Sequence, residues 1–384
     1  MQSGEGALGL AGDAGGVPVE ENKDYLTRQL ITYIGNKRSL FPFIGAALER
    51  VKARLNKRRL SLFDVFSGSG AAARFFKAHG ELLLVNDLEA YSETINRCYL
   101  ANAPELDMES LRRVYGKLLS RLRDEPLREG FISELYAPRE DSAIQAGERV
   151  FYTSRNARYL DTARQYIEEL EESLRPFFLA PLLSEASVHA NTAGVFKGFY
   201  KDRRTGQGRF GGSAEAALRR ITGDITLPFP VFSSFVCPVR IYREDANRLV
   251  RKTAEVDAAY LDPPYNQHPY GSNYFMLNLL LDYKRPSRIS PVSGIPPEWN
   301  RSVYNRKREA PRALAGLAEN IRAKFLLISF NSEGFISREE MEYILHKTGK
   351  VEILETPYNT FRGSRNLQNR DIHVKEYLYI VEKC

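Results

Sequence analysis

The arrangement of residues 60–87 constrains the fold of this 384-residue chain more than any other part of its sequence. An apolar segment, residues 61–66, runs into the turn Ser67-Gly68-Ser69-Gly70. A helix-forming stretch follows at residues 71–77, and a second apolar segment, residues 82–85, ends at Asn86-Asp87. A strand, a glycine turn, a helix and a second strand that ends in an acid form the opening unit of a nucleotide-binding sheet. We therefore predict an α/β fold with a Rossmann-like sheet.

The same rhythm returns late in the chain. An apolar segment at residues 257–261 precedes Asp262-Pro263-Pro264-Tyr265, and further strands are expected at residues 325–330, 351–354 and 377–381. The intervening part is charged and has mostly helical patterning. We predict one α/β domain formed by residues 25–105 and 245–384, a mainly helical insertion at residues 106–244, and a disordered leader at residues 1–24.

Composition narrows the class of protein. No apolar run reaches the roughly 18 residues that a membrane span needs, so we expect no membrane association. The cysteines Cys98, Cys237 and Cys384 form no C-x-x-C pair, which argues against a disulfide framework or a zinc site and favours the cytoplasm. The histidines do not share ligand spacing, so we expect no metal. A formal charge of +7 and a pI near 9.1 suit a polyanionic partner.

The glycine turn and the following acid predict a nucleoside site. Gly68 and Gly70 would let the backbone approach a ligand closely, and the turn leads into a helix N-terminus with free N–H groups. Asp87 could accept both ribose hydroxyls of an adenosine-containing cofactor. Alternatively, Asn86-Asp87 only caps a helix. The phosphate-binding pattern G-x-x-x-x-G-K-[ST] is absent, so a nucleoside triphosphate is not indicated.

The segment Asp262-Pro263-Pro264-Tyr265 predicts the chemistry. Two prolines directly after a strand force a rigid, extended loop. Such a loop can hold the Asp262 carboxylate and the Pro263 carbonyl as fixed acceptors for the N–H bonds of an amine such as adenine N6. These acceptors would localise the nitrogen lone pair and stabilise the positive charge that develops during attack. The Tyr265 ring could stack on the base. Alternatively, the segment is an ordinary turn in which Asp262 caps a helix.

These motifs resemble those of the alpha group of adenine-N6 DNA methyltransferases, the Dam-like family. The family order is an amino-terminal motif, a glycine-rich turn, a target-recognition insertion and the Asp-Pro-Pro-Tyr loop, and all four occur here in that order. Tyr33-Ile34-Gly35-Asn36-Lys37 resembles the amino-terminal motif, and Glu244-Asp245-Ala246 resembles the segment in which an Asp meets the cofactor adenine. The family often has Gly where this chain has Ser67 or Ser69. Residues 327–332 and 374–378 resemble the strand after the catalytic loop and the closing hairpin.

The resemblance, which covers residues 30–100 and 240–384, implies S-adenosylmethionine as the cofactor and double-stranded DNA, with a flipped adenine, as the substrate. It also implies a place in a restriction–modification system, with a cognate restriction endonuclease as a partner, and we expect a monomer. The candidate catalytic residues are Asp262, Pro263, Pro264 and Tyr265. The candidate cofactor-binding residues are Tyr33, Asn36, Lys37, Asp64, Phe66, Ser67, Gly68, Ser69, Gly70, Asp87, Asp245 and Ala246.

DNA contacts are expected chiefly from the insertion. Residues 197–220 contain seven basic side chains against two acidic ones, with aromatic residues between them. Such a segment can neutralise phosphates and place an Arg in the major groove, although a solvated loop has the same composition. A second basic cluster, at residues 358–366, is a candidate loop beside the flipped base. The candidate DNA-binding residues are Lys197, Lys201, Arg203, Arg204, Arg209, Arg362 and Arg365.

Two other classes of function stay open from the residues. The acceptor of the methyl group could be RNA or a protein amide, although related enzymes of that kind often carry Asn-Pro-Pro-Tyr on an uninterrupted sheet. The chain could also be a catalytically idle DNA-binding module, and the intact Asp-Pro-Pro-Tyr segment argues against that reading. A cytosine C5 enzyme would need a Pro-Cys nucleophile, and the adjacent pair here is reversed, Cys237-Pro238.

Overall fold

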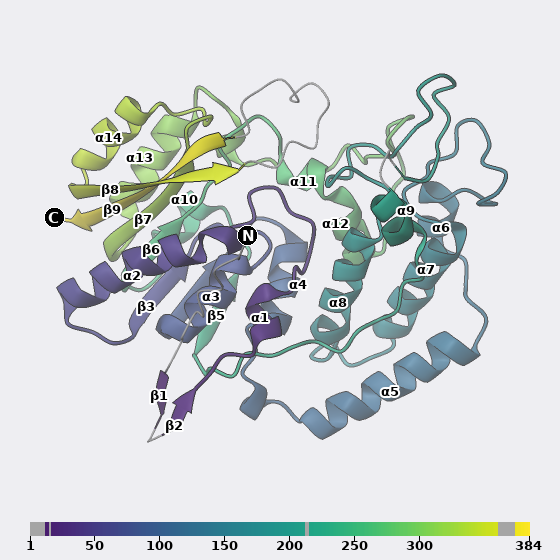
Figure 1. Ribbon diagram of the computed structural model, residues 1–384, viewed down its shortest axis with the longest axis horizontal. Coiled ribbons are helices and arrows are strands. Elements are labelled where there is room, and N and C mark those ends of the chain that lie inside the picture. The colour runs from purple at the N-terminus through teal and green to yellow at the C-terminus, as the bar shows by residue number, and fades with distance from the viewer. Residues whose placement is uncertain (1–11, 15–16, 212–214, 360–372) are drawn as a thin grey trace, which may run out of the picture.

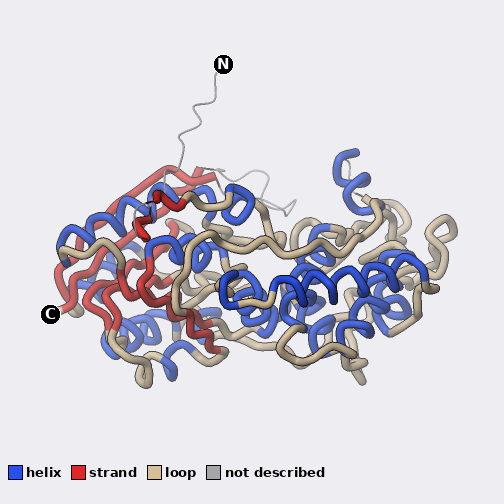
Figure 2. Tube along the Cα trace, turned by 90° about the horizontal axis from the view of Figure 1, so that it is seen from below, coloured by secondary structure: helices blue, strands red, loops and turns tan. Residues whose placement is uncertain are grey.

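The computed structural model describes residues 12–14, 17–211, 215–359 and 373–384 of the chain. A seven-stranded sheet occupies one half of the molecule and a group of helices the other (Figures 1 and 2). The strands of the sheet are β3 (Leu60–Asp64), β4 (Gly80–Asn86), β5 (Val239–Tyr242), β6 (Val256–Leu261), β7 (Ala323–Asn331), β8 (Gly349–Asn359) and β9 (His373–Lys383).

The helices connect these strands and fill the second half of the molecule. They are α1 (Lys23–Thr27), α2 (Phe41–Leu55), α3 (Ala71–His79), α4 (Ala90–Tyr99), α5 (Met108–Asp124), α6 (Phe131–Tyr136), α7 (Ser154–Glu168), α8 (Arg175–Val188), α9 (Glu215–Thr222), α10 (Ala246–Leu249), α11 (Tyr270–Asn273), α12 (Phe275–Asp282), α13 (Ala310–Asn320) and α14 (Arg338–His346). Three 3₁₀ turns, η1 (Arg38–Leu40), η2 (Ala103–Glu105) and η3 (Val303–Asn305), complete the set in the described residues.

The strand order β5-β4-β3-β6-β7-β9-β8 gives the sheet a topological switch point. From β3 the chain adds β4 and then β5 on one side, whereas β6 starts a run that leads to β7 on the other side. These five strands are parallel, so the carboxyl ends of β3 and β6 lie side by side. A crevice at such a point is where open α/β sheets bind ligands. The glycine turn and Asp262 follow these two strands.

Helices cover both faces of the sheet, as an α/β fold requires. Successive residues of each central strand enter different apolar clusters, because side chains alternate across a strand. Leu62 and Ala258 pack on the face that α2, α3 and α4 cover, whereas Phe63 and Ala259 pack on the face that α10, α13 and α14 cover. All six residues of β6 are buried. The predicted α/β fold with a Rossmann-like sheet is therefore confirmed.

The last two strands close the sheet in antiparallel pairs. β9 runs between β7 and β8 and pairs antiparallel with both. The register brings Ser329 opposite Leu378 and Asn331 opposite Glu376. The start of β9, with Glu376, thus lies at the same edge of the sheet as the loop after β6.

The helical half is continuous with the core on one face of the sheet. Helix α4, which follows β4, packs against α8 of the helical half, and residues from both belong to one apolar cluster. Strand β5 lies within residues 106–244, which we assigned to the insertion, but it pairs in parallel with β4, so the sheet resumes at Val239 rather than at residue 245. Its residues are half-buried or exposed, which explains why no apolar run marked it.

The segment assigned to a leader contains two short strands, β1 (Gly12–Ala14) and β2 (Val17–Val19), which pair only with each other among the described residues. Helix α1 follows, and the buried Arg74 side chain donates hydrogen bonds to the carbonyls of Tyr25 and Arg28. No helix in the described ranges has the length and apolar character that crossing a membrane requires.

Candidate active site

The glycine turn is held by contacts that leave no room for side chains at its glycines. Gly68 has a φ of +54° and Gly70 a φ of +74°, which L residues other than glycine rarely adopt. A Cβ on Gly68 would also lie 2.8 Å from the Tyr33 ring. The Ser67 N–H donates to the Asn86 carbonyl at 2.9 Å, which ties the turn to the end of β4. The sequence therefore folds here into a turn that only these glycines permit.

Asp87 fixes the same turn from the end of β4. Its Oδ2 accepts a hydrogen bond from the Gly68 N–H at 2.7 Å, and its Oδ1 accepts one from the Glu89 N–H at 2.9 Å. Burial raises the pKa of Asp87, and these two N–H donors oppose the rise. The Asp87 carboxylate thus lies beside the turn and lines a cleft together with it.

Lys37 and Asp262 form a buried ion pair at the carboxyl end of β6. Their Nζ and Oδ1 atoms lie 3.2 Å apart, and the side chains are 6% and 17% exposed. Burial raises the pKa of Asp262 to about 6, an effect that Lys37 opposes and Glu376 strengthens. Burial alone would lower the pKa of Lys37, but the two carboxylates raise it well above its usual value. The lysine is therefore held as an ammonium ion against Asp262.

Stacked tyrosines hold the amino-terminal motif beside the Asp-Pro-Pro-Tyr loop. The Tyr33 ring stacks on Tyr270 and Tyr274, with centroids 5.0 and 4.8 Å apart. The Ile34 N–H donates to the Tyr274 hydroxyl at 2.8 Å, and the Tyr270 hydroxyl donates to the Ile34 carbonyl at 3.1 Å. Helix α11 starts at Tyr270, soon after Tyr265. These contacts bring residues 33–37 to the loop that follows β6.

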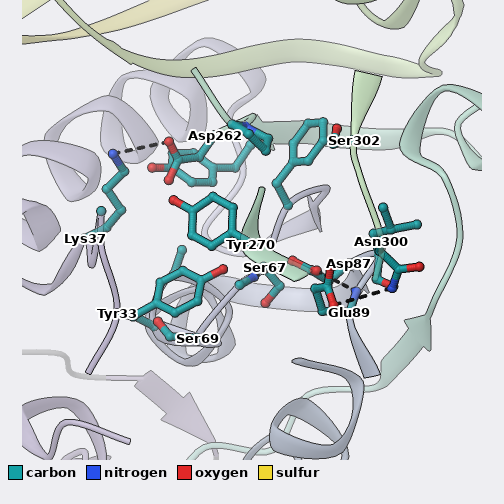
Figure 3. A pocket seen from close by; sticks show the side chains of 18 of the residues that line it. Tyr33, Lys37, Ser67, Ser69, Asp87, Glu89, Asp262, Tyr270, Asn300 and Ser302 are labelled. Carbon is teal, nitrogen blue, oxygen red and sulfur yellow. Dashed lines mark hydrogen bonds and ion pairs between the residues drawn. The ribbon is translucent and has the colours of Figure 1, made fainter. Parts of the chain in front are cut away.

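Together these elements enclose a cleft with about 740 Å³ of empty space, part of it open to solvent. In Figure 3, Lys37 and Asp262 lie on one side of the cleft, Asp87 and Glu89 on the other, and Tyr270 between them. The lining residues are Tyr33, Gly35, Lys37, Phe66, Ser67, Gly68, Ser69, Ala71, Ala72, Asp87, Leu88, Glu89, Tyr260, Asp262, Pro264, Tyr270, Asn300, Ser302 and Asn305.

Most of the candidates from the glycine turn and the amino-terminal motif line this cleft. Asn36, Asp64, Gly70, Pro263, Tyr265, Asp245 and Ala246 are not among the lining residues. Asn36 makes a local turn, with its Oδ1 accepting from the Arg38 N–H at 3.0 Å. Asp245 caps α10, where its side chain accepts from the Arg248 N–H, and Ala246 is buried in the core. Gly70 caps α3, and its N–H donates to the Ser67 carbonyl at 2.9 Å.

The Asp-Pro-Pro-Tyr loop is fixed from two directions. The Tyr265 carbonyl accepts a hydrogen bond from the Phe335 N–H at 3.0 Å, and its ring meets Phe330 edge-on at 5.8 Å. The Asn266 carbonyl accepts from Nδ2 of Asn305 at 2.9 Å. Pro263 is buried. The loop between β6 and α11 is therefore a rigid wall next to the cleft.

Asp64, at the end of β3, is 1% exposed. Burial raises the pKa of its carboxyl to about 8, while the Ser67 hydroxyl opposes the rise and the carboxylates of Asp262 and Asp87 add to it. A carboxyl with this pKa is largely protonated at neutral pH. Asp64 lies behind the glycine turn as a neutral group.

The basic segment of the insertion includes a hairpin, and the residues just before that hairpin contact α11. Lys201 forms a β-bridge with Gly208, and Oδ1 of Asp202 accepts from the N–H groups of Arg204 and Thr205 at 2.9 Å. Residues 203–206 form its exposed tip. Upstream, the Phe196 N–H donates to the Asn273 carbonyl of α11 at 2.8 Å.

The other candidates of the basic segment are placed as follows. Lys197 is exposed and lies close enough to His268 to lower the pKa of that imidazole, although burial lowers it more. The Lys201 ammonium lies over the Phe199 ring at 4.9 Å. Arg209 is exposed, and its N–H donates to the Tyr200 carbonyl at 3.0 Å. Arg362 and Arg365 lie outside the described residues.

Several residues of the site were not predicted from the sequence. Glu89 lines the cleft, and burial raises the pKa of its carboxyl to about 7. Its carboxylate accepts hydrogen bonds from the amides of Asn278 and Asn300 at 2.7 and 3.4 Å. Glu376 contacts Lys37 from β9. A charged residue at the start of the otherwise apolar run 376–381 was the available signal for Glu376.

The side chains that line the cleft indicate what kind of ligand it suits. Aromatic rings, hydroxyls and the carboxylates of Asp87 and Glu89 line it, and Lys37, which is paired with Asp262, is the lining residue with a basic side chain. Among the residues that the structure describes, no group of three or more His, Cys, Asp or Glu side chains could hold a metal ion. The set suits a ligand with hydroxyls, a planar ring and positive charge.

Comparison with known proteins gives a consistent family. The model of the D12 class N6 adenine-specific DNA methyltransferases matches residues 33–290. The chain is 30% identical over 363 residues to the Type II methyltransferase M.NlaIII of Neisseria lactamica, covering 92% of this chain and 99% of that protein. It is 29% identical to M.CviAII of Paramecium bursaria Chlorella virus 1, over 91% of this chain and 98% of that protein. It is 27% identical to M.FokI of Planomicrobium okeanokoites, over 91% of this chain but 52% of that protein.

Proposed function

Because the chain belongs to the D12 class of N6 adenine-specific DNA methyltransferases, we propose that it transfers a methyl group from S-adenosylmethionine to an adenine N6 in double-stranded DNA. The observation that carries this proposal is the position of Asp262. It follows β6 and lines the same cleft as the glycine turn after β3, at the switch point of the sheet. The Asp262 carboxylate, which would accept hydrogen bonds from the target amine, and the glycine turn, which would contact the cofactor, thus line one cleft.

The residues of the cleft fit S-adenosylmethionine. When bound, the cofactor supplies a methyl group on a positively charged sulfur, which departs as a neutral thioether. The carboxylates of Asp87 and Glu89 can accept hydrogen bonds from ribose hydroxyls or an ammonium group, and Tyr33 and Phe66 offer aromatic faces to a cation or a purine. Asp64 and Gly70 support the turn from behind.

Asp262 and the loop after it act on the target base. The Asp262 carboxylate and the Pro263 carbonyl accept hydrogen bonds from the two N–H groups of N6. These hydrogen bonds localise the nitrogen lone pair for attack on the methyl carbon. As the nitrogen–carbon bond forms, the nitrogen becomes positively charged and then loses one proton. Asp262, with a pKa of about 6, is the group on this wall that can take up that proton. Tyr265 stacks on the flipped base, and Pro264 keeps the loop extended.

DNA binding is assigned to the basic segment of the insertion. Arg203 and Arg204 are at the exposed tip of the hairpin, where they can reach phosphates or a base edge in the major groove. Lys197, Lys201 and Arg209 lie along the same segment, which is attached to α11 by the Phe196–Asn273 hydrogen bond. The hairpin and the catalytic loop can therefore contact the same stretch of duplex.

The named relatives suggest the biological setting. Because M.NlaIII and M.CviAII are Type II methyltransferases, we place this protein in a restriction–modification system, with a cognate endonuclease of the same target. We also propose that it acts as a monomer in the cytoplasm. Arg362 and Arg365 stay candidates for contacts beside the flipped base.

A transfer assay tests the proposal. Tritiated S-adenosylmethionine is incubated with unmethylated duplex DNA and either the unsubstituted protein or Asp262→Ala, and the digested nucleosides are identified. Label in N6-methyladenine that is lost with Asp262→Ala is the expected result. The control Asp224→Ala changes a side chain that is 60% exposed and should keep activity. Label in RNA or protein instead of DNA would overturn the DNA assignment. A protein that neither binds S-adenosylmethionine nor transfers the methyl group would overturn the enzyme and leave a DNA-binding module.

A further inference from the structure

A second buried carboxylate contacts Lys37 from the last strand of the sheet. Oε1 of Glu376 lies 2.9 Å from the Lys37 Nζ, and the Glu376 side chain is 1% exposed. The same Nζ lies 3.2 Å from Oδ1 of Asp262. One ammonium ion thus bridges two carboxylates, and the cluster of three groups carries a net negative charge when all are ionised.

Glu376 does not reach the reacting groups itself. Lys37 and Asp262 line the cleft, whereas Glu376 is outside the set of described residues that do so. Its carboxylate is fixed by the Ser329 hydroxyl of β7, which donates to Oε1 at 2.7 Å. Any effect of Glu376 on a bound substrate must therefore pass through Lys37 or through the electric field at Asp262.

We propose that Glu376 is a positioning residue for methyl transfer: it holds the Lys37 ammonium against Asp262 and keeps the Asp262 carboxylate a strong hydrogen-bond acceptor for the target amine. This inference rests on the role proposed for Asp262. It adds a residue from the carboxyl-terminal strand to a site otherwise formed by residues 33–89 and 260–305.

The physical reason is the balance of charge at Lys37. A lysine side chain has four flexible bonds, and holding it in one geometry costs rotamer entropy. Two fixed carboxylates on one ammonium offset that cost. An ammonium that is shared between two carboxylates also neutralises Asp262 less completely than an ammonium bound to Asp262 alone. Asp262 therefore stays basic enough to accept hydrogen bonds from the N–H groups of an incoming amine.

Direct titration of Asp262 tests the inference without any cofactor or DNA. The full-length protein is labelled with ¹³C at aspartate carboxyls, and the Asp262 resonance is identified by its loss in Asp262→Asn. Glu376→Gln removes the charge but keeps the shape, so the Asp262 pKa should fall by about one unit, because one negative neighbour is lost and Lys37 then binds Asp262 alone. Glu382→Gln, on the same strand but with a side chain that is 48% exposed, is the matched control. An unchanged Asp262 titration in Glu376→Gln would overturn the inference.

Single-turnover kinetics give the functional readout. With saturating cofactor and DNA, Glu376→Gln should lower the methylation rate about 10-fold at pH 8 and move the acid limb of the pH profile down by about one unit. The affinities for S-adenosylmethionine and DNA should stay within about twofold, because Glu376 touches neither. Glu376→Asp keeps the charge but shortens the side chain, so its acid limb should stay in place while its rate falls. A wild-type rate in Glu376→Asp would contradict the positioning role, even if Glu376→Gln failed to fold.

A double substitution tests whether Glu376 acts through Lys37. In a Lys37→Met background, adding Glu376→Gln should cause a smaller loss of rate than in the unsubstituted protein, since the contact with Lys37 is already gone and only the direct effect of the charge on Asp262 is left to lose. An equal loss in both backgrounds would overturn the inference. If the unsubstituted protein labels no DNA, the proposed function fails, and the carboxyl titration still decides whether Glu376 sets the state of Asp262.

Discussion

The buried Asp64 carboxyl predicts a pH dependence of stability that one substitution should remove. Its side chain is 1% exposed, and burial raises the pKa to about 8, from 3.8 for the free group. The folded protein therefore binds this proton more tightly than the unfolded chain does. Its contribution to stability is fully present below about pH 4 and is lost as the pH rises towards 8. The sign is the opposite of that for a carboxylate in a favourable ion pair.

The magnitude follows from the shift. Each pH unit between the two pKa values changes the free energy of unfolding by about 1.4 kcal/mol for one proton. From pH 5 to pH 8 this gives about 4 kcal/mol, and partial penetration of water would reduce it to about 2 kcal/mol. Asp64→Asn is neutral at every pH and cannot show this loss. The difference in stability between Asp64→Asn and the unsubstituted protein should therefore shift by about 2–4 kcal/mol in favour of the variant over that range.

Urea denaturation at pH 5, 6, 7 and 8, without cofactor, measures this difference. Using the difference cancels the titration of other groups that both proteins share and that do not interact with Asp64, such as Glu89. Asp224→Asn, with its 60% exposed side chain, controls for the loss of a carboxylate in general. A stability difference between Asp64→Asn and the unsubstituted protein that stays constant from pH 5 to pH 8 would refute a buried, proton-binding Asp64.

Three further predictions concern the cleft and the DNA-binding segment. Tyr265→Ala should lower the methylation rate about 10- to 100-fold, whereas Tyr265→Phe should keep it, because stacking needs the ring and not the hydroxyl. Single-turnover assays measure both rates, and an equal loss in the two variants would contradict stacking. Replacing Arg203 and Arg204 by Ala should reduce the salt dependence of DNA binding by about one unit of slope per phosphate contact, with cofactor affinity unchanged in calorimetry. Gly68→Ala should weaken cofactor binding at least 10-fold, because of the positive φ and the 2.8 Å approach to an aromatic ring, whereas Gly116→Ala, with open space around it, should not.

The parts of the fold that were predictable are those coded by local pattern. The apolar segment before Ser67, the glycine turn and the segment ending at Asp87 each specify their own structure, and the structure has β3, α3 and β4 there. The apolar segment before Asp262 likewise forms β6. The prolines at positions 263 and 264 end that strand for a reason that needs no tertiary contact.

The parts that were not predictable depend on contacts between distant segments. Strand β5 has half-buried and exposed residues, so its place at the edge of the sheet follows from pairing with β4 and not from its own pattern. Glu376 contacts a lysine 339 positions away, and no spacing rule relates the two. The role of Asp87 in holding the Gly68 N–H likewise required the geometry of the turn.

The antiparallel strand β9 makes the active site a late product of chain synthesis. Ribosomes complete residues 33–89 and 260–305 before β9 exists, so a nascent chain can shape the cleft walls without the carboxylate that anchors Lys37. Insertion of β9 between β7 and β8 is the step that delivers it. The carboxylate that contacts Lys37 is therefore the last part of this charged cluster to be made, after the strands that form the cleft walls.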